Sequence, residues 1–111
     1  MKRVLAIASL LFGAPLAAAA HQLIVFASSD CDAVTVEAKF SSGKIAQQGE
    51  VRVLNGENNL LQTLELSTDG LAEILLDSVD HSTGLLIEVD TGGHENYWIL
   101  TPEDIARSCG S

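Results

Sequence analysis

The sequence predicts an all-β protein, a seven-stranded β-sandwich with a short helical turn at its C-terminus. Three observations predict this class. Apolar and polar residues alternate over short runs, turn-forming residues separate these runs at regular spacing, and no long helical period follows the first twenty residues. Alternating strands bury one face each, and two sheets of such strands enclose a core when they pack face to face.

Residues 1–20 have the features of a secretory signal peptide, so the expected domain comprises residues 21–111. A basic start is followed by an apolar run and by four alanines that offer a cleavage site. Cleavage after Ala20 makes His21 the first residue of the mature protein. Cleavage after Ala19 leaves an alanine in front of that histidine, and an uncleaved anchor is a further alternative. The leader predicts a periplasmic protein with no membrane span after cleavage.

The first three strands are expected before a hairpin turn. The run over residues 33–40 alternates most clearly, because Val34 and Val36 fall on one side while Thr35 and Glu37 fall on the other. The third run ends at an Asn-Gly pair, which is a strong signal for a tight hairpin turn. The expected strands are residues 21–27, 33–40 and 50–54.

Four further strands are separated by turns. The turn signals are Thr68-Asp69-Gly70, a polar connection over residues 77–84, and Thr91-Gly92-Gly93, which is expected to close the last hairpin. Thr101 then suits a helix N-cap and Pro102 suits the first helical position, so a short helix or turn is expected to follow. The expected strands are residues 60–66, 71–76, 85–90 and 94–100.

The sequence contains two cysteines, Cys31 and Cys109. A structural disulfide between them is expected, because an exported domain lies in a compartment where disulfides persist. The C-terminal helix would carry Cys109 back to the domain. The alternative is a pair of thiolate metal ligands, which an oxidising compartment disfavours.

The expected mature domain is strongly acidic. Lys2 and Arg3 belong to the leader, so four basic residues remain against fifteen acidic ones, which is a net charge of −11. Nucleic acid does not suit this charge, because phosphate binding needs clustered Lys and Arg. An acidic surface raises the local concentration of cations, and the alternative is that the charge only keeps the domain soluble.

The histidines are the distinctive candidates for chemistry, and they are His21, His81 and His94. A terminal His21 would offer its α-amine and its imidazole to one metal ion. His94 follows two glycines, and His81 lies beside Asp80 in a polar loop; the alternative for each of the three is a histidine without a ligand. Nitrogen ligands suit Ni(II), Co(II), Cu(II) and Zn(II). An enzyme is not expected, because the sequence has no nucleophile elbow and no glycine-rich phosphate loop.

Several segments resemble one known family. They are HQLIVFA at residues 21–27 directly after an alanine-rich leader, FSSG at 40–43 with GEVRV at 49–53, and VDTGGHE at 89–95. Together they resemble the small periplasmic accessory components of energy-coupling-factor nickel and cobalt transporters. Those proteins pair an A-H-x-L-x-V-F-A start with a D-x-G-D-G-H hairpin near the end, and this chain lacks the second acid of the hairpin motif.

The resemblance implies a transthyretin-like sandwich of the prealbumin or CNA-B type. It also implies a metal site at His21 and His94, with a looser match at His81, and Ni²⁺ or Co²⁺ as the ion. The expected function is a periplasmic Ni(II)/Co(II)-binding protein that supports metal uptake by a membrane-embedded transporter. Two alternatives stay open: a metal-free β-sandwich interaction module, and a Cu²⁺ protein with an N-terminal histidine brace.

Overall fold

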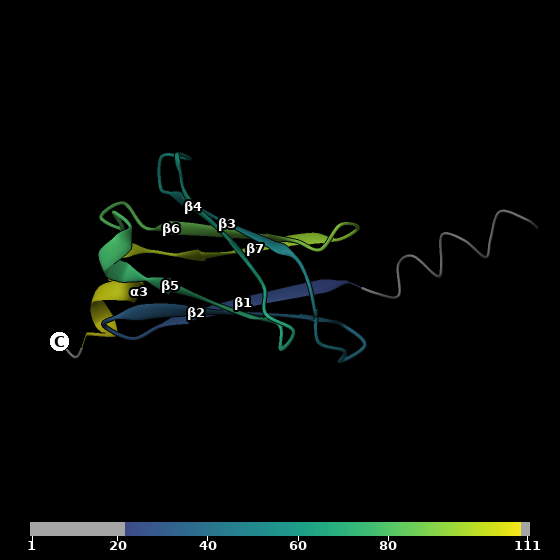
Figure 1. Ribbon diagram of the computed structural model, residues 1–111. Coiled ribbons are helices and arrows are strands. Elements are labelled where there is room, and N and C mark those ends of the chain that lie inside the picture. Colours follow the sequence, from purple (N-terminus) through teal and green to yellow (C-terminus); the bar gives the residue numbers. More distant parts are fainter. Residues whose placement is uncertain (1–21, 110–111) are drawn as a thin grey trace, which may run out of the picture.

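The computed structural model describes residues 22–109, and these residues form a sandwich of two antiparallel sheets (Figure 1). One sheet has the strand order β1-β2-β5 and the other has the order β4-β3-β6-β7. The strands of the described part are β1 Leu23–Ser29, β2 Ala33–Phe40, β3 Glu50–Asn55, β4 Leu60–Glu65, β5 Leu71–Leu75, β6 Leu85–Asp90 and β7 Glu95–Leu100. The predicted all-β sandwich of seven strands is therefore confirmed.

Alternation along the strands sorts the side chains into a core and two outer faces. In β2, Val34 and Val36 are buried between the sheets, whereas Thr35 and Glu37 are exposed. Both sheets contribute to the core. Its most completely buried side chains are Val34, Val36, Val51, Val53, Ile74, Leu85, Ile87 and Val89. Burial of one such side chain stabilises a fold by about 1.5–3 kcal/mol, so this shared interior holds the sheets together.

The two sheets meet along one side, where the first strand lies beside the last. The Asn96 side-chain amide of β7 donates a hydrogen bond of 2.9 Å to the Leu23 carbonyl of β1. Further along, the rings of Phe26 and Trp98 meet edge to face with their centroids 5.0 Å apart. β1 has no strand partner on this side. The Asn96 amide provides a hydrogen-bond donor for one of its edge carbonyls, and the contact between the Phe26 and Trp98 rings covers part of the same edge.

A short helix follows β7 and closes one end of the sandwich. Helix α3, Pro102–Arg107, begins with a capping box in which Thr101 and Asp104 each accept from the other's backbone N–H, and it buries Ile105. A disulfide then joins Cys109 to Cys31 in the loop after β1. The predicted helix and disulfide are both confirmed, and the bond rules out the alternative that these two cysteines act as thiolate metal ligands. Among residues 22–109, no helix has the length and hydrophobicity that crossing a membrane requires.

Two connections differ from the expected turns. The β3–β4 hairpin is present, but its loop is wider than a two-residue turn, and the positive φ of 67° falls on Asn58 instead of Gly56. The polar connection over residues 77–84 begins inside a short 3₁₀ helix, η1 Leu76–Ser78. Neither difference changes the pairing of the strands, because each connection still joins the two strands that were expected to flank it.

Candidate functional site

His94 lies in the hairpin that joins β6 to β7. The backbone N–H of Thr91 donates to the His94 carbonyl at 2.9 Å, and the N–H of Gly92 donates to the Asp90 carboxylate at 2.8 Å. Gly92 has a φ of +98°, a conformation that glycine adopts without steric cost. The predicted Gly-Gly turn therefore forms as a closed loop, and it fixes the backbone position of His94.

The imidazole of His94 is half-buried against an aromatic ring. It meets Phe40 edge to face, with ring centroids 5.5 Å apart and planes at 74°. Phe40 is the last residue of β2 and is paired with Leu23, the first residue of β1. The apolar contact restricts the imidazole on one side, so the ring is oriented at the end of the sandwich where β1 begins.

The first described residue is hydrogen-bonded at the same end. The Gln22 N–H donates to the Ser41 hydroxyl at 3.0 Å, and the Ser41 N–H donates to the Gln22 carbonyl at 2.8 Å. In Figure 1, β1 begins at the end of the molecule that carries the β6–β7 hairpin. Gln22 and His94, which are 72 positions apart in the sequence, are therefore brought to one end of the fold.

His21 and the expected signal-peptide cleavage sites lie outside the described residues. In the sequence, His21 directly precedes Gln22, which is the first residue that the structure describes.

His81 lies at the opposite end of the sandwich. It belongs to the loop before β6, where its carbonyl accepts from the Gly84 N–H at 3.0 Å, whereas His94 belongs to the loop after β6. A strand of six residues is about 20 Å long, and two nitrogens bound to one ion are only about 4 Å apart. The structure therefore separates His81 from His94, and one ion cannot bind both in the same chain.

Asp80 interacts chiefly with Ser82, and the neighbouring His81 contributes only a weaker electrostatic attraction. Its carboxylate accepts from the Ser82 N–H at 3.1 Å. The Ser82 hydroxyl and then the Ser82 N–H hold the pKa of Asp80 below its ordinary value. Across residues 22–109, no three His, Cys, Asp or Glu side chains are gathered as a metal site would need. A site at His94 thus depends on ligands beyond this part of the chain.

A feature that the sequence reasoning missed lies on the outer face of the four-stranded sheet. No acidic pair stood out by spacing, yet strand pairing brings Glu50, Asp90 and Glu95 side by side. A hollow of about 560 Å³ on this face extends from these residues to Arg52 and Tyr97. The alternation in each strand indicates which residues lie on its outer face. It does not predict the register between strands, which determines that these three carboxylates are neighbours.

Comparisons with protein-family models, curated proteins and solved structures find no match to this chain. The fold and the two histidine positions are therefore known from the structure itself, and the transthyretin-like subtype and the transporter family stay predictions from the sequence.

Proposed function

We propose that this protein is an exported domain that binds Ni(II) or Co(II) through His21 and His94 and supplies the ion to a membrane-embedded uptake transporter. The observation that carries the proposal is the set of contacts at one end of the sandwich. His94 packs on Phe40, Phe40 is paired with Leu23, and Gln22 is hydrogen-bonded to Ser41 next to that pair. Gln22, which follows His21 in the sequence, is thereby held at the same end of the sandwich as the His94 ring, and this supports the proposal.

The nitrogen ligands explain how such a site would hold the ion. If the leader is cut after Ala20, His21 offers its α-amine and its ring nitrogen, which close a chelate, and His94 adds a third nitrogen. Imidazole nitrogens suit Ni(II), Co(II) and Cu(II). Three protein ligands leave coordination positions open, so a second protein can take the ion by exchange of ligands. The net charge of −11 that residues 21–111 carry without the leader favours the approach of cations.

A calorimetric titration tests the proposal. The full chain is expressed with its leader, the N-terminus of the purified product is identified by intact mass, and Ni(II), Co(II) and Cu(II) are titrated separately. We expect His94→Ala to weaken Ni(II) or Co(II) binding at least tenfold. His81→Ala is the matched control, because it removes the same side chain from the other end of the sandwich, and it should leave the affinity within twofold.

Two further measurements separate the proposal from its rivals. One additional alanine in front of the mature His21 should weaken binding, because the α-amine then leaves the chelate. Affinity should also fall as the pH is lowered, because protons compete with the metal ion for its nitrogen ligands. Equal losses for His81→Ala and His94→Ala would contradict the site, and tight Cu(II) binding without any Ni(II) or Co(II) response would favour the histidine brace.

A further inference from the structure

Four carboxylates form one row across the outer face of the four-stranded sheet. Glu50 of β3 is paired with Glu65 of β4 on one side and with Asp90 of β6 on the other. Asp90 is paired in turn with Glu95 of β7. Directly opposed residues have their Cβ atoms about 5 Å apart, so each carboxylate lies beside another of the same charge. We call Glu65, Glu50, Asp90 and Glu95 the acidic row.

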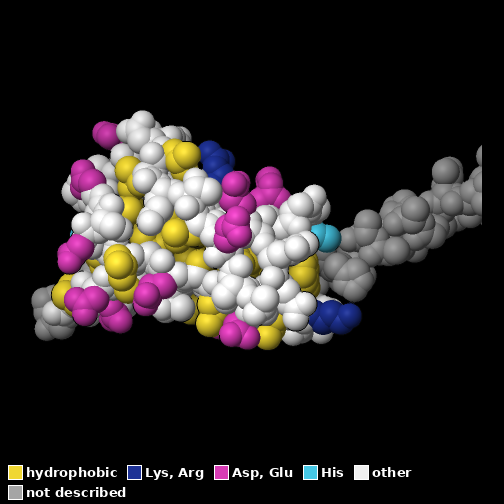
Figure 2. Space-filling view, in the orientation of Figure 1, with side chains coloured by type: hydrophobic (Ala, Val, Ile, Leu, Met, Phe, Trp, Pro, Cys, Tyr) yellow, Lys and Arg dark blue, Asp and Glu magenta, His cyan; other side chains and the backbone are white. Residues whose placement is uncertain are grey.

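The basic residue nearest to the acidic row is already paired. Arg52 and Glu88 lie in the next row of the same face and form an ion pair of 3.0 Å, with both side chains partly exposed. In the described part of the chain, no member of the acidic row has an ion-pair partner. Like charges opposite one another destabilise a sheet, and no ion pair within residues 22–109 offsets that cost. Figure 2 shows acidic side chains gathered near one basic side chain on this side of the molecule.

The same face becomes apolar toward the other end of its strands. Leu54 is paired with Leu60 of β4 and with Leu86 of β6, which is paired with Ile99 of β7. Leu60 and Ile99 are 52% and 56% exposed, while Leu54 is buried between its neighbours. Tyr97, 57% exposed, lies in the row between the acidic and the apolar residues. We call Leu60, Leu54, Leu86 and Ile99 the apolar row.

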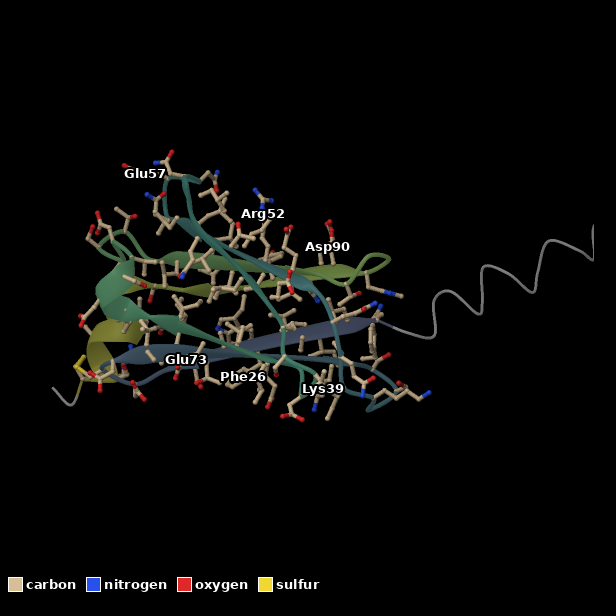
Figure 3. The ribbon with its side chains drawn as sticks, in the orientation of Figure 1. Phe26, Lys39, Arg52, Glu57, Glu73 and Asp90 are labelled. Carbon is tan, nitrogen blue, oxygen red and sulfur yellow. A yellow bond between two sulfur atoms is a disulfide. The ribbon has the colours of Figure 1, made fainter. Side chains whose placement is uncertain are left out.

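We infer that this face is a docking surface for a basic segment of a partner protein that carries apolar side chains next to its Lys or Arg residues. In Figure 3, Arg52 and Asp90 point away from the core on this face, so the surface is open to a partner. Glu50 of the acidic row and Leu54 of the apolar row are about 13 Å apart along β3. An extended partner segment therefore places a basic residue over one row and an apolar residue, about four positions away, over the other.

Charge selects this occupant over the other candidates. A second copy would bring the same row of carboxylates, and a membrane of anionic lipid or a nucleic acid would be repelled by it. A basic segment instead pairs with carboxylates that have no cation in the described part of the chain. Its apolar residues cover Leu60 and Ile99, which are exposed large hydrophobic side chains. The surface does not use His94, so the inference does not depend on the proposed metal site.

The test uses a short peptide as the probe. Acetyl-KKTSLL-amide is titrated into the ¹⁵N-labelled full-chain product, free of metal, and amide shifts are recorded. We expect the shifts to fall on β3, β6 and β7. The double variant Glu50→Gln/Glu95→Gln should weaken binding at least fivefold. The matched control Glu37→Gln/Glu73→Gln makes the same charge change on the outer face of the other sheet and should change affinity less than twofold.

Two additional readouts distinguish a docking surface from general attraction to a charged protein. The peptide KKTSSS should bind more weakly than KKTSLL, and Ile99→Ser should reduce that difference. Glu50→Gln alone should raise the melting temperature by on the order of 3 °C, because it removes the repulsion between Glu50 and the carboxylates of Glu65 and Asp90. The same substitution should weaken peptide binding, because it removes a negative charge that the basic peptide would pair with.

Several results would overturn the inference. They are shifts spread evenly over the molecule, equal losses in the two double variants, or equal binding of KKTSSS and KKTSLL. Preferential binding to vesicles of phosphatidylglycerol would assign the face to a membrane instead. His94→Ala should leave peptide binding unchanged, so failure of the metal site and failure of this surface are distinguishable.

Discussion

Replacing Cys31 and Cys109 by serine removes the bond that joins the loop after β1 to the residues after α3. The bond connects positions 78 residues apart, so the loop that it closes contains every described strand except β1. A loop of this length restricts the unfolded chain strongly, whereas the two ends are already neighbours in the folded domain. We therefore expect the double serine variant to fold in the same way and to be much less stable.

The magnitude follows from the loop length. On the chain-entropy relation, closing about 78 residues stabilises the folded state by about 4.5 kcal/mol at 25 °C. Domains of this size have a free energy of unfolding of about 5–15 kcal/mol, so the loss is a large fraction of the total. It corresponds to a fall in melting temperature on the order of 20 °C or more.

Urea unfolding followed by tryptophan fluorescence measures this loss. Trp98 is the single tryptophan of the sequence and is half-buried against Phe26, so its emission reports the meeting of β1 and β7. The oxidised protein, the protein reduced with a phosphine and the double serine variant are compared. The reduced protein and the variant should unfold at the same urea concentration.

Ser29→Ala provides the matched control. The Ser29 hydroxyl donates to the Ser108 hydroxyl at 3.1 Å, which joins the same two segments without closing a covalent loop. Its loss should cost about 1 kcal/mol or less. The reasoning is refuted if the serine double variant loses less than about 1 kcal/mol, or no more than Ser29→Ala.

Three further predictions concern local features. Thr101→Ala removes the N-cap of α3 and should cost about 1 kcal/mol in urea unfolding; no loss would contradict the cap. Gly84→Ala should lower the free energy of unfolding by at least about 1 kcal/mol more than Gly43→Ala does. Both glycines have a positive φ, but only at Gly84 would a Cβ lie 2.8 Å from the Leu100 carbonyl oxygen, so equal losses of stability would contradict this reasoning. The Thr101 N–H holds the pKa of Asp104 below its ordinary value of 3.8, so its stabilisation is present above about pH 3.8 and is lost as pH falls through the lowered value. Asp104→Asn should therefore make stability between pH 5 and 2.5 less pH-dependent, and an unchanged slope would contradict the assignment.

Alternation in the sequence predicted which side chains face the core, but it could not predict every turn. In the β3–β4 loop, the side-chain oxygen of Asn55 accepts hydrogen bonds from the backbone N–H groups of Glu57 and Asn59. These bonds stabilise a loop that is longer than a two-residue turn. Gly56 is needed there for a different reason than the expected turn, because a Cβ would collide with the Thr83 carbonyl. That carbonyl comes from another loop, so the constraint is tertiary and was not visible in the Asn-Gly pair.

The candidate sites show the same limit. One placement could have been predicted from the sequence: the expected strand over residues 85–90 lies between His81 and His94, and its length is enough to separate the two histidines. The closeness of Gln22 to His94 depends on which strands meet at an edge, and the acidic row depends on register across four strands. Period-2 patterns specify the face of each strand but not its neighbours, so only the folded structure could reveal these placements.

The neighbouring positions of β1 and β7 also constrain the order in which the chain folds. Asn96 and Trp98 complete the edge of the strand that begins at Leu23, so the first described strand is covered only after the last one has been synthesised. Contacts this distant in sequence make folding slow, because a long loop must close before they form. A chain that emerges from its N-terminus, from a ribosome or through a membrane pore, therefore cannot complete the sandwich until residue 98 has emerged, and the open edge of β1 stays uncovered until then.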